Sequence, residues 1–271
     1  MRKAAALVRF FSLASGSSGN SIYVGTERGG ILVDAGISAK KLEGFLLSQF
    51  IRPEDLYGIL ITHEHGDHVC GLPVFLKRYP VPVYATAGTI SYIRRMKGAE
   101  NLSEELFHVI KPGDEITFNG ITVQTCRIMH DAKDPVAYSF LLDGRKIGMA
   151  TDLGCITPEV VKHLSDADLL YLESNYDRYM LLAGPYPYPL KQRIMGECGH
   201  LSNEDSARLV SHVIHEKLRC IVLAHLSKEN NVPDLALITM KNELDGAWNY
   251  DIPKPRLVVA PRDVPMDVIT L

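Results

Sequence analysis

Hydrophobic and polar positions alternate along the first third of the chain with two different periods. Short apolar runs bounded by Gly, Ser and Pro predict strands, and apolar residues spaced three or four apart predict helices. The predicted strands cover residues 9–14, 22–26, 30–35, 58–62 and 81–86. The predicted helices cover residues 39–48, a stretch after residue 62 that ends near residue 79, and 88–97. Ser38 is placed to cap the first of these helices.

The middle of the chain is rich in strands, and helices return toward its end. Hairpin turns of the primed type are predicted at Asn119-Gly120 and Asp143-Gly144. The predicted strands cover residues 105–110, 115–118, 121–129, 136–142, 145–151, 168–173, 219–224 and 256–260. The later helices are predicted over residues 157–165, 202–217 and 234–245. This order favours an α+β fold in which two mixed β-sheets pack face to face and are flanked by helices.

Length, charge and cysteine usage narrow the class of protein. We expect residues 1–271 to form a single domain, since no repeat or linker divides them. The net charge of −3 argues against binding of nucleic acid through overall basicity, although bound divalent cations would add local positive charge. Five cysteines without a C-x-x-C pair predict a reducing compartment. Arg9 interrupts the apolar start and no segment is long enough to span a membrane, so we expect a cytoplasmic protein without membrane contact.

The most informative segment is Thr62–His68, with the sequence Thr-His-Glu-His-Gly-Asp-His at the end of an apolar run. His63 and His65 share one side of an extended backbone, and Asp67 and His68 follow a glycine that lets the chain turn. Imidazole and carboxylate together suit Zn, Mn or Fe. A His-rich surface loop would rarely produce this pattern, so the segment predicts a metal site.

Other strand ends supply further candidate ligands. His130, Asp152 and His225 each lie at or just past the end of a predicted strand. A lone histidine in such a place is more often a hydrogen-bonded core residue. A site for two ions, however, needs about three ligands beyond the first motif.

These motifs resemble the metallo-β-lactamase fold family, and specifically its YycJ/WalJ branch of bacterial metallohydrolases. The family resemblance covers nearly the whole chain and rests on Val33–Gly36, the motif within Thr62–His68, His130, Thr151–Gly154 and His225. The resemblance to the branch rests on Ser15–Asn20, Leu172–Asn175, Gly199–Asn203 and Ala224–Asn231. The fold that it implies is the αβ/βα four-layer sandwich, which agrees with the predicted order of elements.

The resemblance also implies a ligand set for two divalent ions, Mn or Zn or else Fe. In this set, His63, His65 and His130 bind one ion, and Asp67, His68 and His225 bind the other. Asp152 bridges the two ions. Asp34 is implied to orient a ligand imidazole. Two such ions would activate a bridging water as hydroxide and stabilise the charge that develops on a phosphodiester, a lactam or a thioester.

His200 is the candidate that bears on the choice of reaction. It is either a loop histidine bonded to backbone or, as in the ribonuclease Z type of phosphodiesterase, the partner of a glutamate. In the second interpretation Glu173 orients His200, which donates a proton or hydrogen bond to the leaving oxygen. The predicted catalytic residues are Asp67, His200 and Glu173.

Several polar residues near the motifs are candidate substrate contacts. The loop 15–20 is either a phosphate nest or an ordinary turn, and the residues after His225 either hold a phosphate or cap a helix. The segment 184–193 combines tyrosines with two cations, and it is either a lid that stacks a base or a stiff proline-rich connection. The candidate contacts are Ser17, Ser18, Asn20, Asn175, Lys191, Arg193, Lys228, Asn230 and Asn231.

The function that the branch implies is a metal-dependent phosphodiesterase acting on DNA ends, as a 5′-to-3′ exonuclease. An RNA-processing nuclease is the nearer alternative. Against it, the chain has no long insertion between Asp152 and His225 and no obvious protruding arm for tRNA. A hydrolase of small phosphodiesters, lactams or thioesters would share the ligands but not the branch motifs. A non-enzymatic metal-binding protein is disfavoured by the intact ligand set and the Glu173 and His200 pair.

Overall fold

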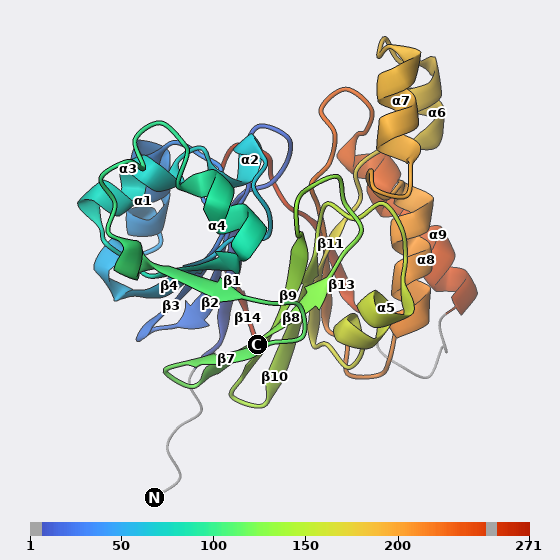
Figure 1. Ribbon diagram of the computed structural model, residues 1–271. Helices are drawn as coiled ribbons and strands as arrows, with labels where there is room; N and C mark the ends of the chain where they lie inside the picture. The colour runs from blue at the N-terminus through green and yellow to red at the C-terminus, as the bar shows by residue number, and fades with distance from the viewer. Residues whose placement is uncertain (1–6, 248–253) are drawn as a thin grey trace, which may run out of the picture.

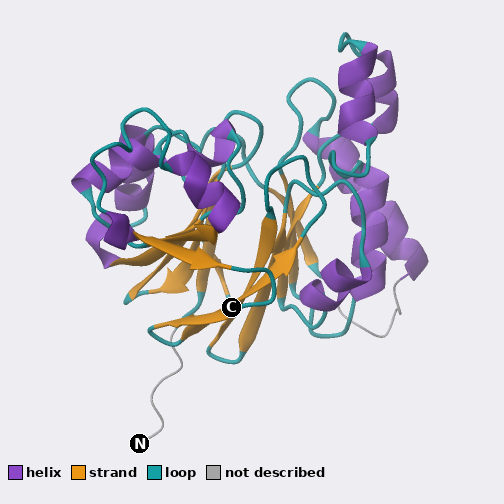
Figure 2. Cartoon of the chain, viewed as in Figure 1, coloured by secondary structure: helices purple, strands orange, loops and turns teal. Residues whose placement is uncertain are grey.

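Two seven-stranded sheets form the centre of the molecule, and helices cover their outer faces (Figures 1 and 2). The computed structural model describes residues 7–247 and 254–271. The first sheet has the order β14 (Ile269–Thr270), β1 (Arg9–Ala14), β2 (Ser21–Thr26), β3 (Gly29–Val33), β4 (Leu56–Leu60), β5 (Val83–Thr86) and β6 (Phe107–Ile110). The second has the order β13 (Arg256–Val259), β12 (Cys220–Ala224), β11 (Leu169–Glu173), β10 (Arg145–Ala150), β9 (Val136–Leu142), β8 (Ile121–Arg127) and β7 (Glu115–Phe118).

Both sheets follow the same plan, an antiparallel part that continues into a parallel part. Strands β1 to β3 pair antiparallel and β3 to β6 pair parallel. Strands β7 to β10 pair antiparallel and β10 to β13 pair parallel. Because loops that leave parallel strands emerge at one edge, this plan gathers chemically active residues at the carboxyl ends of the strands.

The helices are divided between the two sheets (Figure 1). The first sheet is covered by α1 (Ala39–Ser48), α3 (Leu72–Arg78) and α4 (Ala87–Ile93). The second sheet is covered by α5 (Pro158–Leu164), α8 (Asn203–Val213) and α9 (Pro233–Ala247). Two short helices, α6 (Arg178–Ala183) and α7 (Tyr188–Met195), form a hairpin that projects from the body of the molecule. The remaining helical turns are η1 (Pro53–Asp55), α2 (Gly66–Val69) and η2 (Glu104–Leu106).

The main hydrophobic core lies between the sheets. The rings of Phe10 on β1 and Tyr171 on β11 meet there with centroids 5.6 Å apart, and Phe140 of β9 belongs to the same buried cluster. A second cluster, which includes Leu172 and Leu209, joins the outer face of the second sheet to its helices. Burial on both faces explains why the central strands have nearly continuous apolar sequences.

Most of the predicted elements are confirmed, with shifts of one to three residues at their ends, but the helix predicted over 88–97 ends four residues early, at Ile93. Both hairpin turns are of the primed type, since Asn119, Gly120, Asp143 and Gly144 all have positive φ. The predicted helix after residue 62 is instead two helices, α2 and α3. Between them a Cβ at Gly71 would lie 1.8 Å from the Ile37 carbonyl oxygen, so the chain is pressed against a neighbouring loop there.

Three further expectations need correction. The helix predicted over 202–217 ends at Val213, where Ile214 leaves helical geometry with ψ of 137°. More than half of the segment 184–193 belongs to α7. Its Pro189 is compatible with the helix, because it lies in the first turn, where a helix tolerates proline. No obvious protruding arm for tRNA was expected, whereas α6 and α7 form a hairpin that projects from the molecule (Figure 1). Within the described residues, no helix is long and apolar enough to cross a membrane.

Candidate metal centre

The predicted ligands come together at the carboxyl ends of strands from both sheets. His63 follows β4, His130 follows β8, Asp152 follows β10 and His225 follows β12. Asp34, Asp152 and His225 adopt left-handed backbone conformations with φ of 61°, 58° and 54°. Such conformations are costly for these residue types, and they cluster at functional sites where the surrounding structure enforces them.

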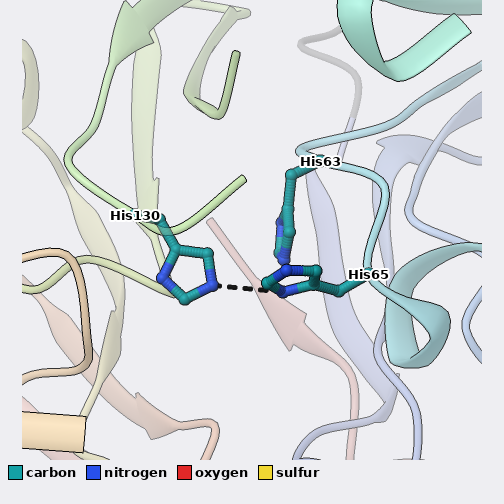
Figure 3. Close-up of side chains that lie close together, drawn as sticks. All are labelled: His63, His65 and His130. Atoms are coloured by element: carbon teal, nitrogen blue, oxygen red, sulfur yellow. Dashed lines mark hydrogen bonds between the residues drawn. The ribbon is translucent and has the colours of Figure 1, made fainter. Parts of the chain in front are cut away.

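The first group of candidate ligands consists of His63, His65 and His130 (Figure 3). Their ligand nitrogens all lie within 4.8 Å of one another. His130 Nε2 is 3.3 Å from His65 Nδ1, and the rings of His63 and His130 are 5.0 Å apart between centroids. Three imidazoles that converge on one point from two sheets match the donor set of a hydrolytic zinc-type site.

The second group consists of Asp67, His68 and His225, and Asp152 lies between the two groups. Oδ2 of Asp67 is 3.5 Å from Nε2 of both His68 and His225. Asp152 places Oδ2 3.3 Å from His68 Nε2 and Oδ1 4.0 Å from His130 Nε2. One carboxylate thus reaches a histidine of each group, which is the placement that a bridging ligand requires.

Hydrogen bonds to the Nδ1 atoms fix the orientation of two of the candidate ligand rings. Asp34 accepts a hydrogen bond of 2.7 Å from His68 Nδ1, and it also accepts one of 2.9 Å from the Thr62 amide. His130 donates through Nδ1 to the Gly199 carbonyl at 3.0 Å. These bonds place the proton on Nδ1 and leave Nε2 of His68 and His130 free to bind metal.

Charge in the centre favours a bound cation. Burial and the neighbouring imidazoles of His68 and His130 hold the pKa of His63 well below its ordinary value, so that ring is neutral. Burial also opposes a charge on His225, but Asp152, Asp67 and Glu173 raise the pKa of His225 to about 10. In the metal-free protein a proton on His225 therefore balances the buried carboxylates, and a metal ion would replace it.

Two buried atoms indicate that the residues fit a metal. His63 Nε2 and Asp152 Oδ2 are both buried, and neither has a hydrogen-bond partner within the described part of the chain. An uncompensated buried polar atom is costly, and coordination to a cation would satisfy both atoms. We conclude that this cluster of histidines and aspartates binds divalent metal.

Glu173 and His200 lie directly beside the ligands. Glu173 is fully buried at the end of β11, and its Oε1 accepts a hydrogen bond of 2.8 Å from His200 Nδ1. The same oxygen lies 3.0 Å from His225 Nδ1, and Oε2 accepts from the Leu201 amide at 2.9 Å. Burial alone would lower the pKa of His200, but the Glu173 carboxylate raises it above its ordinary value. His200 keeps 19% of its side chain exposed, so a bound substrate can reach its outer edge.

Glu64 lies inside the first motif and has contacts in the site that the sequence did not predict. Its side chain is buried, Oε1 accepts a hydrogen bond of 2.8 Å from the Lys133 amide, and Oε2 accepts from Thr89 Oγ1 at 3.3 Å. The bond to Lys133 joins the loop of His63 and His65 to the loop of His130. A glutamate between two ligand histidines was the only signal available in the sequence.

The predicted substrate contacts divide into exposed residues and buried ones. Ser17, Ser18 and Lys228 are exposed near the centre. The four asparagines are buried and hold loops together; for example, Asn20 accepts from the Gly16 amide at 2.8 Å and lies 3.2 Å from Asp67 Oδ2. These side chains are therefore too buried to contact a substrate directly, which applies to Asn20, Asn175, Asn230 and Asn231.

The two cations of the 184–193 segment already have partners within the protein. Lys191 Nζ donates to the carbonyls of Leu182 and Gly184 at 2.6 and 2.8 Å, which closes the α6–α7 hairpin. Arg193 Nε donates to Asp131 Oδ2 at 2.5 Å at the rim of the centre. A phosphate contact by either residue would compete with these bonds.

Comparisons with known proteins agree with this fold and ligand set. A profile of the β-lactamase superfamily domain matches residues 30–225. The exodeoxyribonuclease WalJ of Streptococcus pneumoniae is 39% identical over 236 residues, which cover 87% of this chain and 88% of that protein. The exodeoxyribonuclease YycJ of Bacillus anthracis is 38% identical over 238 residues, or 88% of this chain and 89% of that protein. The crystal structure of the metallo-β-lactamase fold protein YhfI from Bacillus subtilis matches with a TM-score of 0.71 at 13% identity, covering 96% of this chain and 99% of that chain.

The chain belongs to the β-lactamase superfamily, and its two mixed sheets flanked by helices are the metallo-β-lactamase fold. Its identity with WalJ and YycJ over most of their lengths places it in the YycJ/WalJ branch. The family and the fold class that the sequence motifs predicted are thereby confirmed.

Proposed function

We propose that this protein is a metal-dependent exonuclease that degrades DNA from its 5′ ends with two divalent ions, Mn or Zn. The observation that carries the proposal is the Glu173 and His200 pair, hydrogen-bonded at 2.8 Å, beside a full set of His and Asp ligands. The similarity to exodeoxyribonucleases over most of the chain supports DNA as the substrate. When bound, two such ions activate water and stabilise the charge that develops on a phosphodiester.

The protein groups around the centre suit departure of an alcohol or nucleotide oxygen. Because Glu173 accepts the proton of His200 Nδ1, the other ring nitrogen is the one that can serve the substrate. Because the Glu173 carboxylate raises the pKa of His200, the ring is better able to hold a second proton and to transfer it to a leaving oxygen. Asp67 and Asp152 would supply negative charge to hold the ions, and Asp34 fixes the ring of His68.

The proposal can be tested with metal-free protein reloaded separately with Mn and Zn. Each form would receive end-labelled duplex DNA, single-stranded DNA and RNA of the same sequence. We expect stepwise shortening of DNA from the 5′ end. Asp67→Asn should abolish it, because the variant loses a charged ligand. Asp143→Asn is the matched control and should behave as wild type, because this exposed carboxylate lies in the turn before β10, at the opposite end of that strand from Asp152.

Other outcomes would point to the alternatives. Faster loss of RNA than of DNA would replace the proposal with an RNA-processing nuclease. Intact polynucleotides with both metals would overturn the nuclease, and hydrolysis of a small phosphodiester, lactam or thioester would then identify the reaction.

A further inference from the structure

Arg262 lies against the loop that follows His225 and, unlike Arg193, makes no ion pair with a described carboxylate. It follows β13 in the chain, and its guanidinium donates through Nη2 to the Leu226 carbonyl at 2.7 Å. Leu226 is the residue directly after the ligand His225. Arg262 is partly buried, yet within the described residues its side chain has no carboxylate partner. By contrast, Arg193 is paired with Asp131.

Two loops that build the centre hold the guanidinium in place. The Ser15 amide donates to the Arg262 carbonyl at 3.2 Å, and the Ser15 hydroxyl accepts from the His225 amide at 2.9 Å. A Cβ on Gly16 would lie 2.7 Å from Arg262 Nη1, so the glycine leaves room for the guanidinium against the backbone. The cation is thereby fixed between the loop of Ser15 and the loop that follows His225.

The surroundings of Arg262 suit an anion. Ser17, Ser18 and Lys228 are exposed on the same two loops, and neither serine amide donates to another described residue. The nearest acidic group in sequence, Asp263, accepts from the Ser18 hydroxyl at 3.3 Å and makes no ion pair with Arg262. A planar guanidinium with free N–H groups is well matched to two phosphate oxygens.

We infer that Arg262 binds a phosphate of the substrate strand next to the phosphodiester that is cleaved. The inference rests on the proposed function and names a contact that the sequence motifs did not include. It also adds one fixed positive charge beside the metal centre of a protein whose net charge is −3.

Arg262→Gln tests this contact, with Arg262→Lys as the variant that keeps the charge. We expect Arg262→Gln to raise KM for DNA roughly tenfold, the usual effect of losing a charge-assisted hydrogen bond. The slope of log(kcat/KM) against log salt should become shallower by about 0.7 to 0.9, since one phosphate contact is lost. Hydrolysis of bis(p-nitrophenyl) phosphate, which has no neighbouring phosphate, should stay at the wild-type rate. Arg262→Lys should restore part of the salt slope.

Controls separate the phosphate contact from a loss of structure. Arg219→Gln removes a cation at the opposite end of β12 from His225 and should leave KM and the salt slope unchanged. Metal content of the Arg262 variants should match wild type. Loss of metal together with the rise in KM would mean that Arg262 positions the loop after His225, and it would overturn the inference. If wild-type protein degrades DNA but Arg262→Gln keeps its KM and salt slope, the inference is wrong. If wild-type protein leaves every polynucleotide intact, the proposed function fails and the inference fails with it.

Discussion

His200 and His225 donate hydrogen bonds to the same atom, Oε1 of Glu173, at 2.8 and 3.0 Å. One buried carboxylate therefore orients both a candidate metal ligand and the candidate proton donor. A change in Glu173 should affect metal binding and catalysis together, whereas a change in His200 should affect catalysis alone.

Glu173→Gln should lower both kcat and metal affinity. The amide cannot accept both hydrogen bonds through a charged oxygen, so His225 loses an orienting partner and affinity should fall about 10- to 100-fold. His200→Ala should lower kcat about 10²- to 10⁴-fold and leave metal content unchanged. Metal titration and saturation kinetics of both variants give the two quantities. Equal metal affinity in wild type and Glu173→Gln would contradict the shared role.

Asp152→Asn should lose metal from both groups of ligands. Asp152 lies within 4.0 Å of histidines in each group, so neutralising it weakens both positions at once. We expect metal affinity to fall by on the order of 100-fold or more and activity to be lost. Elemental analysis after dialysis measures the effect, and retention of two full equivalents of metal would rule out a bridging role.

Glu64→Ala should loosen the loop of His130 relative to that of His63. Without the acceptor for the Lys133 amide, the geometry of the first ligand group is less constrained, and metal affinity should fall about 10- to 100-fold. Glu64→Gln keeps an oxygen for the Lys133 amide and should stay close to wild type. If both variants bound metal as tightly as wild type, the glutamate would have no positioning role.

Stability should fall with acid partly through His163. Burial first, and then Lys146, lower the pKa of His163 to about 4 in the folded protein. The unfolded chain takes up this proton from an ordinary pKa of about 6.5, so the penalty is absent above that pH and grows as pH falls toward 4. Between pH 7.5 and 5 the free energy of unfolding should drop by about 2 kcal/mol from this group.

Urea unfolding at the two pH values, with wild type and His163→Phe compared, checks this contribution. The variant should lose about 2 kcal/mol less than wild type between pH 7.5 and 5. His108→Gln, which changes an exposed histidine on β6, should lose as much as wild type. An identical pH dependence in His163→Phe would show that the buried ring is not responsible.

The sequence predicted the sheets well and the projecting hairpin poorly, for a physical reason. Strands such as β4 and β12 have continuous apolar runs because both of their faces are buried. Helix α7 has no buried residue, so it lacks the apolar stripe by which a helix is recognised. The prolines at and before its first turn also made a proline-rich connection a more natural prediction than a helix. The two-residue β14 was missed because so short a strand has no periodicity.

The candidate ligands could be located from sequence because each follows a strand with a strong apolar signal. The motif in Thr62–His68 indicates metal binding by its histidines and aspartate. His130, Asp152 and His225 share its position at strand ends. Arg262 and Glu64 could not be assigned in this way. Their roles depend on loops that lie 36 and 69 residues away along the chain, and no local pattern records such contacts.

Each group of ligands draws on both sheets, which has a consequence during protein synthesis. The first group needs His130 to complete His63 and His65, and the second needs His225 to complete Asp67 and His68. A ribosome that has made β1 to β6 has produced two of the three residues in each of these candidate ligand groups. The nascent chain therefore cannot cut nucleic acid in its vicinity until β12 has emerged and folded. We expect translation products that end before His225 to lack nuclease activity, because one candidate ligand group is then incomplete.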